Sequence, residues 1–296
     1  MTQPTRLPVV SDLQWTLTRS GSFITCGRTS PRLPPGAYTV TLDHCGESHF
    51  RPHPFHTDDL IAFPDSVWAD VLAEVGTFWA TGDRFARLGF AHRRGYLFYG
   101  KQGCGKSSLI HQLVNRVVGA GHVAFFCGCP TAFRYGAARF REVEPERPAV
   151  CVFEDIDAII KEYGDAELLQ VLDGNGQIDK VVNLASTNYP ERLDRRIIAR
   201  PRRFDRLLRI DPPDAGLRGA FFAKKLPHLP AGDVARWVAA SDGLPFAALT
   251  ELVISVECLG HELGAAAAAL RELDRHAPSS DEFGGAPLPD LATTCV

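Results

Sequence analysis

The stretch GKQGCGKSS, residues 100–108, decides the fold of this chain. It matches the pattern G-x-x-x-x-G-K-[ST], it follows an apolar strand-like segment at 95–100, and it opens a helical pattern, which is the context that the pattern requires. Glycines at 100, 103 and 105 allow the backbone to curl until its N–H groups face phosphate oxygens. The positive end of the following helix points at the same place. The stretch therefore predicts a phosphate-binding loop, and this context disfavours a chance glycine-rich turn.

Each side chain of this loop has an expected task. Lys106 is expected to reach the β- and γ-phosphates of a nucleotide, and Ser107 is expected to bind Mg²⁺. The remaining loop positions are expected to contact the nucleotide through their backbone or hydroxyl groups: Gly100, Gly103, Cys104, Gly105 and Ser108. ATP and Mg²⁺ are the expected cofactors.

Apolar segments alternate with helical patterns on both sides of the loop. The predicted strands are 95–100, 122–127, 149–153, 181–187 and 206–210. Because these segments are apolar almost throughout, they predict a parallel sheet that helices cover on both faces. Only helical patterns follow, up to about residue 275. We therefore expect an α/β ATPase domain at 58–213, a small helical lid at 214–275, and a flexible tail rich in Pro, Gly and Ser at 276–296.

The first 57 residues differ from the rest. Short alternating segments separated by turns predict a small β-rich module at 1–57. Five metal-type side chains occur there, namely His44, Cys45, His49, His53 and His56. Their spacing matches no ligand pattern, so solvated turn histidines are favoured over a zinc site.

Two further strand ends carry polar residues. The apolar segment 149–153 leads into Glu154 and Asp155, and an apolar strand ending in acids lies beside the Mg²⁺ site in P-loop nucleotidases. The segment 181–187 leads into Asn188, which can orient an attacking water or touch the γ-phosphate. Either strand end alone is compatible with an ordinary turn. Because a phosphate loop precedes them in the chain, we expect both strand ends to contribute to the same nucleotide site.

Taken in order, these motifs resemble the AAA ATPases of the AAA+ superfamily over roughly residues 58–275. The Glu-Asp order of the acids is similar to that of the mitochondrial complex III assembly AAA protein and its bacterial and phage relatives. The resemblance implies that Glu154 serves the Mg²⁺ site, that Asp155 polarises the attacking water, and that the chain forms a ring, most often a hexamer. Because the usual order is Asp then Glu, slow or absent turnover remains an alternative.

The segment RRIIARPRRFDR, 195–206, contains six arginines. The resemblance implies that Arg200 and Arg203 act on the ATP of a neighbouring subunit, where an arginine finger can contribute roughly 10³- to 10⁵-fold in rate. The alternatives are a solvated basic loop and a nucleic-acid patch. The second is disfavoured because few aromatic residues accompany the arginines.

Composition limits the class of protein. The 296 residues carry a net charge of −3, which offers no global attraction to nucleic acid or to an anionic membrane. No apolar run is long enough to span a membrane, and we expect no secretory signal, because the first residues contain no apolar core of the kind that such a signal needs. The cysteines form no C-x-x-C pair, so we expect reduced thiols and a cytoplasmic protein.

Two functions are compatible with these motifs. The first is an ATP-driven machine that remodels a protein substrate, recruited through the N-terminal module and gripped by Phe133 and Tyr135 in a central loop; these aromatic residues are at least as compatible with packing in a short helix. The second is a nucleotide-gated assembly or binding module with little turnover. An ATPase associated with nucleic acid is a weaker third alternative.

Overall fold

The computed structural model describes residues 14–18, 21–27, 29–54, 67–173, 179–198 and 203–275. The chain forms two compact units, Met1–Pro34 and Pro35–Val296. In the first unit, strand β1 (Gln14–Leu17) pairs antiparallel with β2 (Phe23–Cys26). The second unit contains the large sheet and the helical lid.

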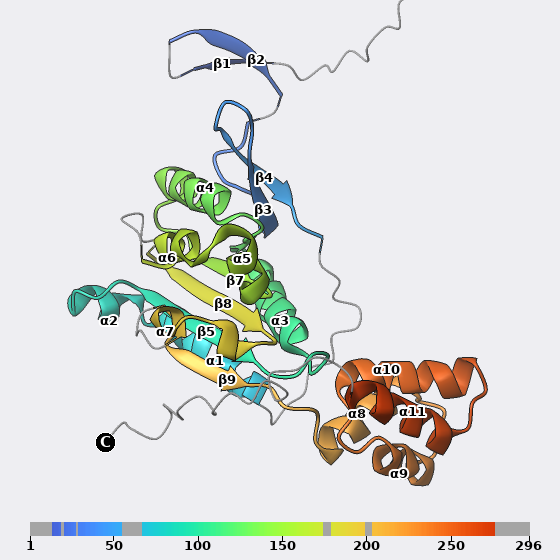
Figure 1. Ribbon diagram of the computed structural model, residues 1–296. Helices are drawn as coiled ribbons and strands as arrows, with labels where there is room; N and C mark the ends of the chain where they lie inside the picture. The colour runs from blue at the N-terminus through green and yellow to red at the C-terminus, as the bar shows by residue number, and fades with distance from the viewer. Residues whose placement is uncertain are drawn as a thin grey trace, which may run out of the picture. The chain divides into compact units, whose positions relative to one another are not determined.

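The second unit is built on a seven-stranded sheet with the strand order β4-β3-β6-β7-β8-β5-β9 (Figure 1). The strands span β3 Gly36–Leu42, β4 Ser48–Pro52, β5 Arg93–Tyr99, β6 Val123–Phe126, β7 Ala149–Phe153, β8 Val181–Thr187 and β9 Arg206–Arg209. All neighbours pair in parallel except β3 and β4, which form an antiparallel hairpin. The five strands predicted from apolar segments are confirmed as β5 to β9.

Helices cover both faces of this sheet. On one face, α1 (Val67–Ala80) and α3 (Lys106–Gly119) pack on alternate strand residues such as Tyr96 and Phe98. On the other face lies α4 (Pro130–Val143), where the ring of Phe140 meets that of Phe125 at 4.9 Å. Shorter helices follow the strands: α2 Gly82–Arg87, α5 Ile156–Tyr163, α6 Asp165–Asp173 and α7 Arg195–Ile198. The expected α/β architecture is confirmed.

The expected boundary of the N-terminal module differs from the structure. Residues 36–52 do not belong to a separate module, because β3 extends the large sheet by pairing with β6, from Gly36 opposite Val123 to Thr39 opposite Phe126. The division between compact units falls at Pro34–Pro35 instead of after residue 57. An alternating segment correctly predicted a strand at β3, but alternation carries no information about which sheet the strand joins.

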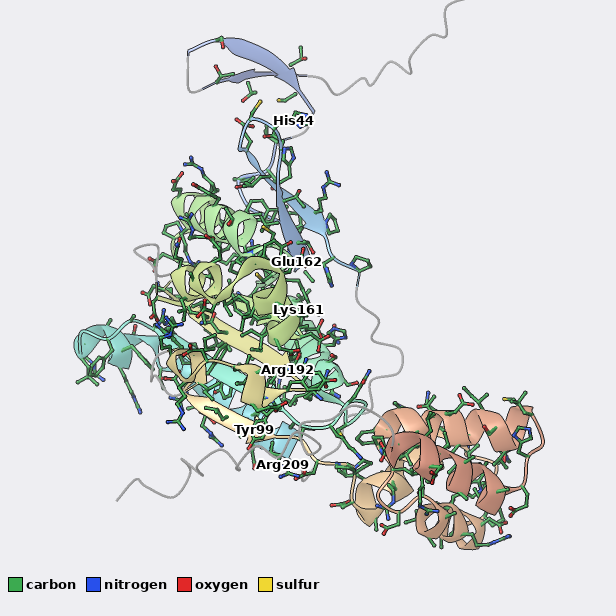
Figure 2. The ribbon with its side chains drawn as sticks, viewed as in Figure 1. His44, Tyr99, Lys161, Glu162, Arg192 and Arg209 are labelled. Carbon is green, nitrogen blue, oxygen red and sulfur yellow. The ribbon has the colours of Figure 1, made fainter. Side chains whose placement is uncertain are left out.

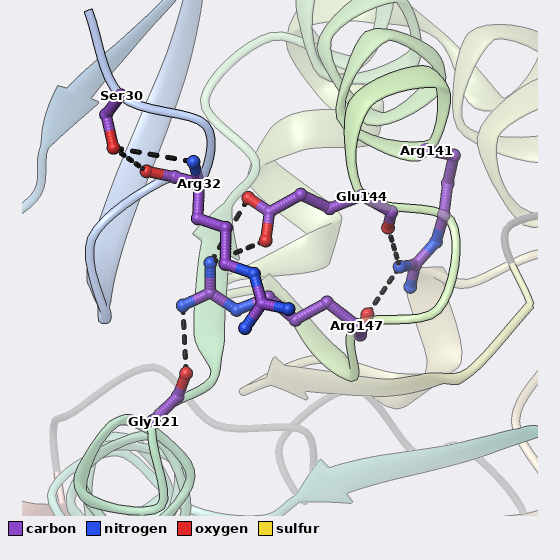
Figure 3. A network of polar contacts seen from close by, with 6 residues as sticks. All are labelled: Ser30, Arg32, Gly121, Arg141, Glu144 and Arg147. Atoms are coloured by element: carbon purple, nitrogen blue, oxygen red, sulfur yellow. Dashed lines mark hydrogen bonds and ion pairs between the residues drawn. The ribbon is translucent and has the colours of Figure 1, made fainter.

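A network of charged groups fixes the connection from α4 to β7 (Figure 3). The Arg147 guanidinium lies 2.9 Å from a carboxylate oxygen of Glu144 and donates to the backbone oxygen of Gly121 at 2.8 Å. Arg141 donates to the backbone oxygen of Glu144 at 3.2 Å. Glu144 and Arg147 are nearly buried, so this short connection is held rigidly before the acidic strand begins.

The helical lid confirms the expectation that helices alone follow residue 214 in the described part of the chain. It consists of α8 (Ala215–Lys225), α9 (Ala231–Ala240), α10 (Phe246–Val253), a π-helical turn at Ile254–Cys258 and α11 (Leu263–Arg275). Its core includes Phe222 and Trp237, whose rings lie 5.2 Å apart. The expected tail, 276–296, lies outside the described residues.

Candidate nucleotide-binding site

The phosphate loop follows the carboxyl end of β5. Tyr99 ends that strand and pairs with Arg209 of β9 (Figure 2). Gly100 has a φ of 143°, and a Cβ there would lie 2.3 Å from the backbone oxygen of Ile210, so only glycine fits between the loop and the strand. Gly105, with a φ of 99°, turns the chain into α3. The glycines predicted to shape the loop therefore have structural reasons to be glycine.

Lys106 is buried, with 6% of its surface exposed. Its Nζ donates to the backbone oxygens of Gly100 at 2.7 Å and Lys101 at 2.8 Å. Burial lowers the pKa of this amine, while Cys104, Asp155 and Asp157 act in the opposite direction. An ammonium whose hydration is replaced by two neutral carbonyls favours the arrival of an anion.

The two adjacent acids at the end of β7 have different surroundings. Asp155 has a left-handed backbone with φ 45° and ψ 55°, and its N–H donates to Ser186 Oγ at 3.2 Å. Asn188 Nδ2 donates to Asp155 Oδ1 at 3.4 Å, which joins the ends of β7 and β8. Glu154 Oε2 instead lies 3.5 Å from His111 Nε2 on α3.

These surroundings shift the two pKa values in opposite directions. Burial and the negative charges of Asp157 and Glu154 raise the pKa of Asp155. Burial also acts to raise the pKa of Glu154, but contacts with His111 and Ser107 outweigh it and leave that pKa below its usual value. Glu154 is thus a stable carboxylate next to the Ser107 hydroxyl, and hard oxygen donors of this kind suit Mg²⁺. The residues fit the expected metal, whereas Asp155 has the raised pKa typical of a base.

A cavity of about 410 Å³ brings the site together. Its lining residues come from the phosphate loop, from the ends of β7 and β8, and from the lid: Gln102, Gly103, Gly105, Lys106, Ser107, Ser108, Asp155, Ser186, Asn188, Phe221, Lys225, Phe246, Ala247 and Thr250. A short 3₁₀ helix, Pro190–Arg192, follows Asn188, and the guanidinium of Arg192 lies 3.9 Å from the centre of the Tyr189 ring.

The lid contacts the phosphate loop directly, which the sequence did not reveal. The Ala247 N–H donates to the backbone oxygen of Gly103 at 3.2 Å. A Cβ on Gly103 would lie 2.9 Å from Ala247 Cβ. In addition, Lys101 Nζ lies 2.8 Å from Asp274 Oδ2 near the end of α11. No local pattern signals a pair of residues so far apart in the chain.

Arg203 and Arg206, in the described parts of the arginine-rich segment, contact acidic groups of their own chain. Arg203 has 4% of its surface exposed, and its guanidinium contacts Asp173 and the backbone oxygen of Arg196. Arg206 donates to Glu74 at 2.6 Å. Arg200 lies outside the described residues. A solvated basic loop is therefore a poor description of Arg203.

The remaining candidate residues are the two aromatic residues proposed to grip a substrate and the histidines and cysteine considered as metal ligands. Phe133 is buried against Phe153, with the rings 5.4 Å apart, so it belongs to the core beneath α4, whereas Tyr135 is exposed. Within the described residues, no group of three or more His, Cys, Asp or Glu side chains is placed to hold a metal. His53 is not a solvated turn residue, because its ring stacks on Phe126 at 4.0 Å. His56 lies outside the described residues.

The sequence of this chain was compared with those of known proteins and protein families. Residues 96–212 match the family described as "ATPase family associated with various cellular activities (AAA)". The chain is 28% identical over 229 residues to the ATP-dependent zinc metalloprotease FtsH 2 of Symbiobacterium thermophilum, covering 69% of this chain and 38% of that protein. It is 30% identical over 243 residues to FtsH 1 of Sorangium cellulosum, covering 73% and 38%. It is 28% identical over 170 residues to human ATPase family gene 2 protein homolog A, covering 51% and 19%.

The chain thus spans less than half the length of each of these relatives. They do not confirm the expected likeness to the complex III assembly protein. None of the helices in the described part of the chain combines the length and the apolar character that spanning a membrane requires. The family match runs from within β5 to just beyond β9 and includes the phosphate loop and both strand-end acids, so residues 96–212 form a domain of the AAA ATPase family.

Proposed function

We propose that this chain binds ATP with Mg²⁺ in the cavity between the phosphate loop and the lid, and that it hydrolyses the ATP. One observation carries the proposal: the cavity is lined at once by Lys106, by Asp155 with Asn188, and by aromatic lid residues. The buried cation suits the triphosphate, and the carboxylate with a raised pKa suits the attacking water. The apolar surface suits the adenine ring.

The polar end of the cavity serves the triphosphate. Lys106 exchanges its two carbonyl partners for phosphate oxygens, and charge-assisted hydrogen bonds of this kind are roughly twice as strong as neutral ones. Ser107 and Glu154 would hold the metal, which when bound neutralises charge on the phosphates. Asp155 accepts the proton of the attacking water, and Asn188 orients that water and the Asp155 carboxylate.

The aromatic lid residues of the cavity suit the adenine ring of the nucleotide. Phe221 on α8 and Phe246 on α10 have ring centres 6.0 Å apart. Both residues belong to the lid, so an adenine ring packed against them would couple nucleotide binding to the position of the lid. Lys225 and Thr250, which line the same cavity, offer polar contacts to ring nitrogens.

We further propose that the active form is a ring-shaped homo-oligomer, a hexamer as is typical for this family, which remodels a protein substrate. The burial of Arg203 supports a division of work between the two arginines: Arg203 anchors the segment through Asp173, and Arg200 reaches the ATP of the neighbour. The first unit, up to Pro34, is the proposed place of partner recruitment.

Three variants test the chemistry. Lys106→Ala should abolish productive ATP binding, Asp155→Asn should retain ATP while stopping hydrolysis, and Glu154→Gln should weaken the Mg²⁺ dependence. Binding is measured with a fluorescent ATP analogue and turnover by phosphate release. Unchanged ATP affinity and turnover in a folded Lys106→Ala protein would refute the assignment of the site.

A mixing experiment tests the oligomer. Lys106→Ala and Arg200→Ala proteins should each be inactive, but after subunit exchange some interfaces combine an intact loop with an intact finger and should recover activity. Recovery requires a finger that acts between subunits. If labelled subunits exchange and no activity returns, Arg200 does not act on a neighbour.

A nucleotide-gated module with little turnover is the second candidate. Two observations favour it: Arg203 is engaged inside its own chain, and the proposed base is an aspartate, which is one methylene shorter than the usual glutamate. Turnover per subunit measured against protein concentration separates the two functions. A steep rise supports the machine, and negligible turnover with ATP-dependent assembly supports the gate.

A further inference from the structure

A column of aromatic rings connects the β3–β4 hairpin to Glu154. His53, just beyond β4, stacks on Phe126 of β6 with the ring planes 9° apart. The Phe126 ring meets the ring of His111 at 6.1 Å and 61°. His111 Nε2 in turn lies 3.5 Å from Glu154 Oε2, so the column joins β6 and α3 with the residues that directly follow β4 and β7.

Both ends of the column are fixed. His53 Nδ1 shares a hydrogen bond of 2.8 Å with Thr39 Oγ1 on β3, which sets the orientation of the imidazole. Phe126 has 6% of its surface exposed. At the other end, Glu154 also contacts Ser107, the first hydroxyl after Lys106. The two ends are linked by charge as well, since Glu154 and His53 influence each other electrostatically.

Glu154 needs such a restraint more than the usual aspartate would. Its extra methylene adds a rotatable bond, and holding a longer side chain in one orientation costs more conformational entropy. Partners that hydrogen-bond a metal-binding carboxylate orient it, and their loss typically weakens metal affinity by roughly 10- to 100-fold. His111, with Nε2 at 3.5 Å from Glu154 Oε2, lies at ion-pair distance and is placed for this role.

We propose that His111 is the positioning residue of Glu154 and that His53, acting through Phe126, makes the β3–β4 hairpin part of the Mg²⁺ site. The hairpin lies outside residues 96–212, so this role is additional to the part of the chain that the family match covers. The inference rests on the proposed function, because it requires a nucleotide with Mg²⁺ in the cavity.

The test uses the full chain and measures binding without turnover. The affinity for a fluorescent ATP analogue is measured in EDTA, and Mg²⁺ is then titrated at a fixed analogue concentration. His111→Leu should leave the affinity in EDTA near that of the wild type and should raise the half-saturating Mg²⁺ concentration by about 10- to 100-fold. His111→Gln keeps an N–H donor and should restore most of the Mg²⁺ response. His53→Leu should give a smaller shift in the same direction.

Matched controls separate positioning from packing. Asn115→Leu lies one turn further along α3 at an exposed position, and His49→Leu lies on β4 at a half-exposed side chain. Both should keep the wild-type Mg²⁺ response. Urea denaturation of each variant shows whether it is folded, and the Gln variant preserves the test if the Leu variant is unstable.

Each outcome decides the matter. If Glu154→Gln shifts the Mg²⁺ response and His111→Leu does not, the proposed function stands and the positioning role of His111 is refuted. If His111→Leu and His111→Gln lose the Mg²⁺ response equally, the hydrogen-bond donor is irrelevant and the inference also fails. If the wild-type protein binds no analogue with or without Mg²⁺, both proposals are overturned.

Discussion

Gly136→Ala tests the close packing of α4 on the N-terminal strand β3. A Cβ at position 136 would lie 2.3 Å from Val40 Cγ1 and 2.9 Å from Val40 Cγ2, and Val40 is 3% exposed. The helix or the strand must therefore move. Overpacking of this kind costs roughly 1–3 kcal/mol, and the better helix propensity of alanine returns about 1 kcal/mol. We expect a net loss of up to about 2 kcal/mol in the free energy of unfolding.

Urea denaturation followed by circular dichroism measures this loss. Gly76→Ala in α1 is the matched control, because an added Cβ there meets nothing within 4 Å. The control should stabilise the protein by about 0.4–1 kcal/mol. Combining Gly136→Ala with Val40→Ala removes the clashing methyl groups, so the double variant should be more stable than the sum of the two single effects predicts. If Gly136→Ala stabilises the protein as much as Gly76→Ala does, β3 does not lie beneath α4.

Three further predictions concern the site. Lys101→Ala and Asp274→Ala should each speed release of a fluorescent ATP analogue, with a coupling of about 0.5–1 kcal/mol in a double-mutant cycle, because their ion pair ties the lid to the loop; additive effects would contradict this. The raised pKa of Asp155 means that folding favours its protonated form, so the carboxylate costs stability once the pH exceeds its unfolded-state pKa. Asp155→Asn should therefore raise the melting temperature at neutral pH but not below pH 3.8, while wild-type hydrolysis falls as acid protonates the carboxylate. Arg203→Ala should lower the free energy of unfolding by about 1–3 kcal/mol, since it removes the charged hydrogen bonds of the buried Arg203 guanidinium to Asp173. Arg200→Ala should leave stability unchanged, and equal effects of the two substitutions on unfolding would refute the proposed division of work.

The sequence predicted those features that depend on local patterns. The phosphate loop was recognisable because its glycines, Lys106 and Ser107 occur within nine residues between a strand and a helix. The parallel strands were recognisable because both of their faces are buried, which requires apolar residues at almost every position. Asp155 and Asn188 could be placed together because parallel strands bring their carboxyl ends to one edge, and the structure brings them within 3.4 Å.

Features that depend on distant partners were not predictable. The strand at 36–42 alternates as a half-buried strand of any sheet would, and only its pairing with β6 places it in the large sheet. Lys101 lies within the predicted phosphate loop, but its partner Asp274 lies 173 residues away in the sequence. Arg203 was interpreted from its motif, whereas its contact with Asp173 depends on how the end of α6 lies against a residue far along the chain. In each case the sequence carries the residue but not the contact.

The contacts of Glu154 and Asp155 give a physical reason for the Glu-Asp order after β7. Glu154 and Asp155 form the turn that follows β7; Glu154 contacts His111 and Ser107, while Asp155 lines the cavity. The left-handed backbone at Asp155 is costly for a residue with a side chain, by about 1–2 kcal/mol, and the hydrogen bond from its N–H to Ser186 Oγ offsets part of that cost. Strained conformations of this kind occur where a side chain must be aimed. The longer acid therefore occupies the position where several partners restrain it, and the shorter acid occupies the position where the backbone itself does the aiming.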